Sequence, residues 1–128
     1  MKSKKSLRQD IFNYAKKKYG AEPEYLWMKF PEHAVLRNEK NKKWFAVIMD
    51  VDNGALGIEG GGRTDIMDIK CDRLLIDLLI KKDGFLPAYH MNKNSWVTVL
   101  LDGTVSPQEI YPLLDESFAG VDKLKPKK

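Results

Sequence analysis

Cysteine is almost absent from this chain of 128 residues, and its single copy, Cys71, excludes a disulfide within the chain. A lone thiol suits a reducing compartment, so we expect a cytoplasmic protein. Histidine is also scarce, because only His33 and His90 are present and they lie far apart in the sequence. The chain therefore shows neither the spacing of a transition-metal site nor a cofactor motif, and we expect no cofactor and no metal.

Long hydrophobic runs are missing as well. The longest, residues 44–49, has six residues and cannot span a bilayer. The basic N-terminus is not followed by the apolar stretch of a signal peptide, because Arg8, Gln9 and Asp10 interrupt it. We expect no membrane association. The length predicts a single domain over residues 1–128, and we expect a monomer.

Charge of one sign is concentrated at the two ends. Residues 1–19 contain seven Lys or Arg and one Asp, and residues 123–128 contain four Lys and no acid. The segment between them has eleven basic and seventeen acidic side chains and is therefore acidic, at −6. We expect residues 123–128 to form a flexible, solvated tail; the alternative is a basic arm that attracts phosphates.

Three helices are predicted from hydrophobic periodicity. The first covers about residues 4–18, is capped by Ser3 or Ser6 and stops at Gly20. The second runs from Asp72 to about residue 82, with a buried stripe of Leu75, Leu78 and Leu79 that is widened by Leu74, Ile76 and Ile80. The third starts at Ser106 and Pro107, and Pro112 should bend or shorten it.

Alternating hydrophobic residues or runs of β-branched and aromatic residues predict strands over residues 24–30, 33–37, 43–51, 65–71 and 96–101, with a further short strand near Ala88. Core-directed positions are expected at Leu26, Met28 and Phe30. In the strand 43–51, one face should carry Phe45, Val47, Met49 and Val51, and the other Trp44, Ala46 and Ile48. In the strand 65–71, Met67, Ile69 and Cys71 should point inward, and Asp68 and Lys70 outward. Helices on an antiparallel sheet of about five strands make an α+β sandwich.

No catalytic constellation emerges from these residues, and we expect a protein that is not an enzyme. Cys71 lies on a predicted inward face, which favours a buried, inert thiol. The Gly-rich segment 52–64 matches neither a calcium loop nor a phosphate loop. His90 has two interpretations: it orients its hairpin by bonding to the backbone, or it lines a groove and contacts phosphate or substrate.

Two hairpin arms offer the best candidate site. The first tip, residues 38–43, is crowded with cations, and the second combines one lysine with two asparagines. Long cations can reach phosphates, and Asn can bond to base edges. These tips predict a DNA-binding protein whose candidate contacts are Arg37, Lys40, Lys42, Lys43, His90, Asn92, Lys93 and Asn94. The alternative for the cations is ordinary solubilisation of turns.

Many short segments, in order, resemble one family. They include Tyr25 to Pro31, Ala34 to Arg37, Lys43 to Ala46, Lys70 to Asp72 and Gly84 to Lys93. Over about residues 7–118 the chain resembles the MmcQ/YjbR family of small bacterial proteins. The resemblance implies a CyaY-like fold and a "double wing" mode of DNA binding. A frataxin-like iron function is not expected, because the first predicted helix is basic.

A second class of function fits the same residues. The runs 89–92 and 27–29 could frame a cleft, and the acidic middle of the chain disfavours a polyanion. The alternative is therefore a small-molecule or protein-binding module without catalysis.

Overall fold

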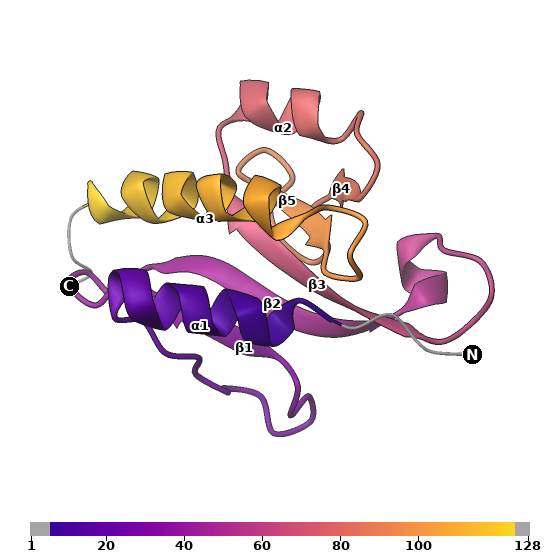
Figure 1. The fold of residues 1–128 in the computed structure, drawn as a ribbon, viewed down its shortest axis with the longest axis horizontal. Coiled ribbons are helices and arrows are strands. Elements are labelled where there is room, and N and C mark those ends of the chain that lie inside the picture. The colour runs from indigo at the N-terminus through magenta and orange to yellow at the C-terminus, as the bar shows by residue number, and fades with distance from the viewer. Residues whose placement is uncertain (1–5, 125–128) are drawn as a thin grey trace.

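The protein is an antiparallel sheet with helices packed on one face, as a computed structural model that describes residues 6–124 shows (Figure 1). All strand pairs are antiparallel, and the strand order in the sheet is β1-β2-β3-β5-β4. The elements are α1 (Arg8–Tyr19), β1 (Ala34–Arg37), β2 (Trp44–Asp52), the 3-10 turn η1 (Asn53–Leu56), β3 (Arg63–Lys70), α2 (Arg73–Leu79), β4 (Phe85–Pro87), β5 (Trp96–Leu100) and α3 (Pro107–Asp122). The predicted α+β fold with five strands and three helices is confirmed.

Helices α1 and α3 lie side by side on the sheet (Figure 1), joined by aromatic and charged contacts. The rings of Tyr14 and Tyr111 stack with centroids 4.0 Å apart. Asp115 accepts hydrogen bonds from Tyr14 and Tyr19 and pairs with Lys18 at 2.9 Å. Burial alone would raise the pKa of Asp115, but these hydrogen bonds lower it. The two helices therefore form one layer over the main core.

The helix ends agree in part with their predicted signals. Asp72 caps α2 through a 2.9 Å hydrogen bond from the Leu75 N–H, as expected. The first helix differs, because its N-cap is Leu7; the Ser6 hydroxyl accepts the Arg8 N–H and donates to Asp65. The other candidate cap, Ser3, lies outside the described residues, as does most of the predicted tail at 123–128. Pro112 does not shorten α3, which continues to Asp122.

The predicted faces of β2 were wrong at Trp44 and Phe45, and a β-bulge is the reason. The pairing of β1 with β2 shifts between Leu36 and Arg37, so Phe45 is an extra residue. Its ring packs under the helices, edge-on to Tyr19 and Phe118, together with Ala46 and Ile48. The opposite face instead receives Trp44, Val47, Met49 and Val51.

Ser117 of α3 completes the ladder beside this bulge. Regular pairing of β2 with β3 begins at Ala46 and Ile69, one residue past Phe45 and Lys70. The buried Ser117 hydroxyl donates to the Phe45 carbonyl at 2.6 Å and accepts the Lys70 N–H at 3.0 Å. One side chain thus satisfies two backbone groups that the bulge leaves without strand partners.

The predicted strand over residues 24–30 is also wrong. A single bridge joins Glu24 to Val35, and turns follow. Its alternating residues do not point into the core: Leu26 and Phe30 are exposed, and Met28 is fully exposed. Pro23 and Pro31 flank the segment, and each lacks the N–H that strand pairing needs. The segment is instead an outer loop whose Trp27 contacts the sheet.

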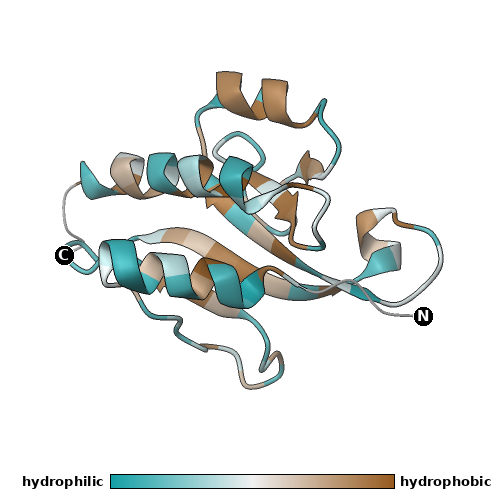
Figure 2. Ribbon diagram, in the orientation of Figure 1, coloured by the Kyte–Doolittle hydropathy of each residue, from teal (hydrophilic) through white to brown (hydrophobic). Residues whose placement is uncertain are grey.

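Two further expectations about burial are corrected. Asp68 was expected to point outward into water, but it is fully buried, because the loop after β4 covers that part of the sheet. In α2, Ile76 and Leu79 are buried, whereas Leu74 and Leu78 are exposed. Helix α2 has its main contacts with β4 and β5, and Leu74 and Leu78 stay in solvent although the helix is hydrophobic over most of its length (Figure 2).

Candidate functional site: an aromatic cleft

The face of the sheet opposite α1 and α3 has its own hydrophobic cluster. Its centre is Val35, Val47, Met49 and Ile66, and none of α1, α2 and α3 contributes a residue to it. Side chains from three connecting segments pack on it instead: Trp27 before β1, Leu56 and Ile58 between β2 and β3, and Tyr89 and Met91 between β4 and β5. These segments do not close completely. They leave a cleft of about 560 Å³, lined by Trp27, Phe30, His33, Trp44, Val47, Met49, Asp50, Val51, Asp52, Arg63, Tyr89, His90 and Met91.

Two tryptophans form a corner of this cleft. The rings of Trp27 and Trp44 are nearly perpendicular, at 77°, with centroids 5.9 Å apart. The bulge in β2 turns Trp44 to this face, and the loop before β1 brings Trp27 against it. His33 extends the wall, because it is edge-on to Trp27 at 6.1 Å and stacked on Phe30 at 4.8 Å. The cleft therefore presents a nearly continuous aromatic surface.

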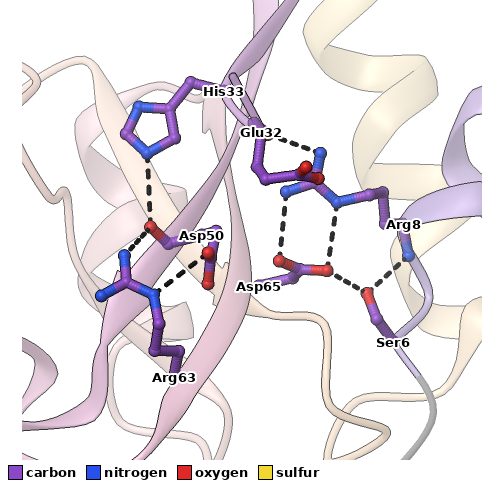
Figure 3. Close-up of polar contacts among 7 residues, drawn as sticks. All are labelled: Ser6, Arg8, Glu32, His33, Asp50, Arg63 and Asp65. Carbon is purple, nitrogen blue, oxygen red and sulfur yellow. Dashed lines mark hydrogen bonds and ion pairs between the residues drawn. The ribbon is translucent and has the colours of Figure 1, made fainter. Parts of the chain in front are cut away.

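One end of the cleft is charged and rigidly bonded (Figure 3). Arg63 donates to the Asp50 carboxylate at 3.0 Å and to the Asp50 main-chain oxygen at 2.8 Å. The His33 Nε2 lies 3.3 Å from the same main-chain oxygen. Asp50 thus links β2 to the loop before β1 and to β3.

A neighbouring network explains how two acids can face each other here. Asp50 and Asp65 are directly opposite across β2 and β3, an unfavourable arrangement for like charges. Asp65 has its own arginine, because Arg8 binds both carboxylate oxygens at 3.1 Å and also donates to the Glu32 carbonyl (Figure 3). Burial alone would raise the pKa of Asp65, but the hydrogen bonds from Arg8 and Ser6 lower it. Each acid therefore has its own arginine: Arg63 pairs with Asp50, and Arg8 pairs with Asp65.

Residues 89–91 form the opposite wall of the cleft and are held by a series of buried hydrogen bonds. The Tyr89 N–H donates to Thr98 Oγ1 at 2.8 Å, and the Thr98 hydroxyl donates to Asp68. The other Asp68 oxygen, Oδ2, has no hydrogen-bond partner among residues 6–124. Burial raises the pKa of Asp68 to about 7, although the bond from Thr98 and the charge of Lys93 act against it.

His90 adopts an uncommon backbone conformation on that wall. Its φ of 60° is in the left-handed region, and its ring lies edge-on to Tyr89 with centroids 4.0 Å apart. Histidine tolerates this region better than most residues, but glycine would adopt it more easily. Of the candidate contacts predicted from the sequence, His90 lines the cleft.

The remaining candidate contacts lie around the two hairpin tips. The first tip lies between Arg37 and Trp44, where β2 begins, and the second tip precedes Trp96, where β5 begins. Both strands begin beside the end of β3, at Lys70, so both tips lie at the same end of the sheet. The first tip is docked on the end of α3: Asn38 donates to Asp122 at 2.7 Å, and Lys40 pairs with the same acid at 3.0 Å.

Asn41 strengthens this docking. Its buried amide donates to the carbonyls of Val121 and Leu124 at 2.8 and 3.1 Å, at the end of the helix. Arg37 is also occupied, by an ion pair with Glu24 at 3.2 Å. Lys42 and Lys43 form no ion pair with any residue that the structure describes.

The second tip is tied to α2 and to its own loop. The Asn94 side-chain oxygen accepts a hydrogen bond from Arg73, and Asn92 accepts the Asn94 N–H at 2.8 Å. The Lys93 ammonium donates to the Ala88 carbonyl at 3.0 Å, although the residue as a whole is exposed. The predicted cations therefore lie at one end of the sheet. Among residues 6–124, Lys42, Lys43 and Lys93 form no ion pair with an acid.

Sequence reasoning had named both runs that frame the cleft but missed its charged end. Phe30, His33, Asp50 and Arg63 were not singled out, since they come from separate segments and no short motif joins them. The only available signal was the density of aromatic residues between 25 and 45. Cys71 lies away from the cleft, half-buried, and burial raises its thiol pKa to about 12.

Comparison with known proteins settles the relationship of the chain. The YjbR family model matches residues 16–119. The chain belongs to the YjbR family. The "Uncharacterized protein YyaQ" of Bacillus subtilis (strain 168) is 43% identical over 111 residues, which cover 87% of this chain and 94% of YyaQ.

Solved structures share the fold of this YjbR-family protein. A crystal structure of a protein from Pseudomonas syringae has a TM-score of 0.86 and 45% identity, covering 89% of this chain and 97% of the other. A solution NMR structure of a protein from the same organism has a TM-score of 0.82 and 43% identity, covering 94% and 96%. A crystal structure from Deinococcus radiodurans, 21% identical with a TM-score of 0.72, shares the fold; the match covers 96% of this chain and 83% of that one.

No group of three or more His, Cys, Asp or Glu between residues 6 and 124 could hold a metal ion. None of the helices in this range is long and apolar enough to cross a membrane.

Proposed function

We propose that this YjbR-family protein is a binding module for a small organic molecule, which it holds in the aromatic cleft without catalysing a reaction. The observation that supports this proposal is the cleft itself. Its volume is about 560 Å³, and it has two nearly perpendicular tryptophans at one corner and the Asp50–Arg63 pair at one end. Binding sites for small molecules are usually concave, mostly apolar and equipped with a few well-positioned polar groups. We expect it to act as a cytoplasmic monomer.

Binding without catalysis is favoured by the state of the reactive groups. The Cys71 thiol is half-buried with a raised pKa, away from the cleft, so it is a poor nucleophile. At the cleft, His33 is hydrogen-bonded to a main-chain oxygen rather than to a hydroxyl or thiol that it could activate. Asp50 is occupied by Arg63.

A thermal-shift screen against a metabolite library tests this proposal. A genuine ligand at about a hundredfold excess over its dissociation constant should stabilise the protein by roughly 2.7 kcal/mol. The shift should be lost in Trp27→Leu and kept in Tyr25→Leu. Both residues belong to the same loop, but Tyr25 is exposed and does not line the cleft. Hits that shift Trp27→Leu as strongly as wild type would contradict binding in the cleft.

DNA binding through the two hairpin tips is the second candidate, favoured by the presence of both tips at one end of the sheet. Lys42, Lys43 and Lys93 would contact phosphates, while Asn92 and Asn94 would reach groove edges. Because Arg37 and Lys40 are paired with acids, three cations remain. The slope of log affinity against log salt should then not exceed roughly −3, at about −0.9 per phosphate.

Fluorescence anisotropy with duplex DNA separates the two candidates. The double variant Lys42→Ala/Lys43→Ala should reduce the magnitude of the slope of log affinity against log salt by about 2. A matched control is Lys81→Ala/Lys82→Ala, because these lysines are exposed and lie just before β4, at the end of the sheet away from the tips. If the slope falls equally in both double variants, DNA is attracted by the general positive charge of the protein and is not bound specifically by the hairpin tips.

A further inference from the structure

The aromatic corner of the cleft has a definite electrostatic character. The face of an aromatic ring is negative and attracts cations whose centre lies within about 6 Å of the ring centroid. The rings of Trp27 and Trp44, at 77° and 5.9 Å, form two adjoining walls. Tyr89 and Phe30 add further aromatic lining. A positively charged ligand could therefore contact more than one ring at once.

The charged residues of the cleft add to this preference. Its lining contains two acids, Asp50 and Asp52, and one cation, Arg63. Arg63 is already engaged by the carboxylate and main-chain oxygen of Asp50, so it is poorly placed to receive an anionic ligand. Asp52 accepts a backbone N–H from Gly54 at 2.8 Å and forms no ion pair with a residue that the structure describes. With neutral histidines, the ionisable lining thus carries one net negative charge.

The volume of the cleft sets the size of the ligand. At about 560 Å³ it is within the usual range of sites for drug-sized molecules. A simple ammonium ion would leave most of it empty, whereas a flat body of two fused rings can lie along the aromatic walls.

We infer that the cleft selects flat heteroaromatic cations, of the N-alkylated quinolinium or pyridinium type, over neutral and anionic molecules of the same shape. This inference rests on the proposed function, because it specifies the ligand class of the same cleft. The positive ring nitrogen would lie against Trp27, whose ring adjoins Trp44 on one side and, on the other, His33, which is bonded to Asp50.

Three two-ring probes of similar size test the charge preference: N-methylquinolinium, 1-naphthylmethanol and 1-naphthoate. Titration calorimetry at pH 8, where imidazoles are mostly neutral, measures each affinity. We expect the cation to bind roughly tenfold more tightly than the neutral probe, from the size of desolvated cation–π interactions. The anion should bind most weakly.

Two variants separate the contributions of charge and ring. Asp50→Asn should weaken the cation about two- to fivefold and strengthen the anion, because it removes a negative charge and releases Arg63. Asp77→Asn is the matched control, since Asp77 forms a similar exposed pair with Arg73 on α2. Trp27→Leu should bring the affinities for the cation and for the neutral probe close together.

The tryptophan side chains report where each probe binds. The chain has three tryptophans, of which Trp27 and Trp44 line the cleft and Trp96 does not. If the neutral or anionic probe shifts the indole N–H signals of Trp27 and Trp44 and binds as tightly as the cation, the charge preference is wrong while the binding function stands. If no probe shifts these two signals, the cleft does not bind such ligands, and the proposed function fails with the inference.

Discussion

Asp68 should make the protein less stable as the pH rises toward neutral. This acid is fully buried on the cleft side of the sheet, and burial raises its pKa from 3.8 to about 7. A folded-state pKa above the unfolded value means that the native state binds the proton more tightly. The associated stability is present below pH 3.8 and is lost as the pH passes through about 7. At 1.36 kcal/mol per pKa unit, the total loss is about 4 kcal/mol.

Other acids change stability in the opposite direction but at lower pH. The pKa values of Asp65, Asp115 and Asp122 are lowered, so their contributions are gained as the pH rises and are complete above the unfolded value of 3.8. Between about pH 5 and pH 8 the effect of Asp68 should dominate and amount to roughly 2 to 3 kcal/mol.

Urea unfolding of Asp68→Asn across this pH range measures the effect. Asparagine keeps an oxygen for the Thr98 hydroxyl but cannot ionise. Because imidazoles titrate in the same range, both proteins are compared in a background of His33→Gln/His90→Gln. We expect the free energy of unfolding to fall with pH when Asp68 is present and to stay nearly flat in the Asp68→Asn variant, so that the variant is the more stable at pH 8. Parallel profiles for the two proteins would refute the assignment.

Three further substitutions test the described contacts. Asn41→Ala should lower the free energy of unfolding by about 1 to 3 kcal/mol in urea, because it removes the buried amide that bonds to the carbonyls of Val121 and Leu124 and to the Lys43 N–H. Ser117→Ala should cost a similar amount by unpairing two backbone groups beside the bulge; the exposed neighbour Glu116→Ala should cost much less. His90→Gly should maintain or raise the melting temperature by relieving a positive φ, while it weakens ligand binding in the cleft. A lower melting temperature for His90→Gly would show that the imidazole is needed for the fold.

The fold was largely predictable because its signals are local. The capping Asp72, the turn at Gly20, the alternation along β3 and the β-branched run of β5 identified most elements, and their order predicted helices on an antiparallel sheet. The errors arose where non-local contacts decide. The bulge at Phe45 depends on Ser117, which is 72 positions away. Asp68 is polar by sequence and buried only because a later loop covers it.

The site was harder to predict for the same reason. Runs 27–29 and 89–92 were named as possible walls, but the cleft exists only because the segment 24–30 fails to become a strand and lies across the open face. The alternating pattern of Leu26, Met28 and Phe30 is the pattern of a half-buried strand, and only its lack of paired neighbours shows otherwise. Whether a cation at a hairpin tip is free or paired also depends on distant acids, such as Asp122 for Lys40.

The most direct test of the account is the indole region of a ¹H–¹⁵N NMR spectrum, recorded with and without each hit from the metabolite screen. With three tryptophans in the chain, three signals are expected. Binding in the cleft should shift the signals of Trp27 and Trp44 together and saturably, and leave the buried Trp96 nearly unchanged. Hits that leave both cleft signals in place, with duplex DNA instead shifting the backbone amides of Lys42 and Lys43, would contradict a small-molecule cleft and favour the hairpin tips as the functional surface.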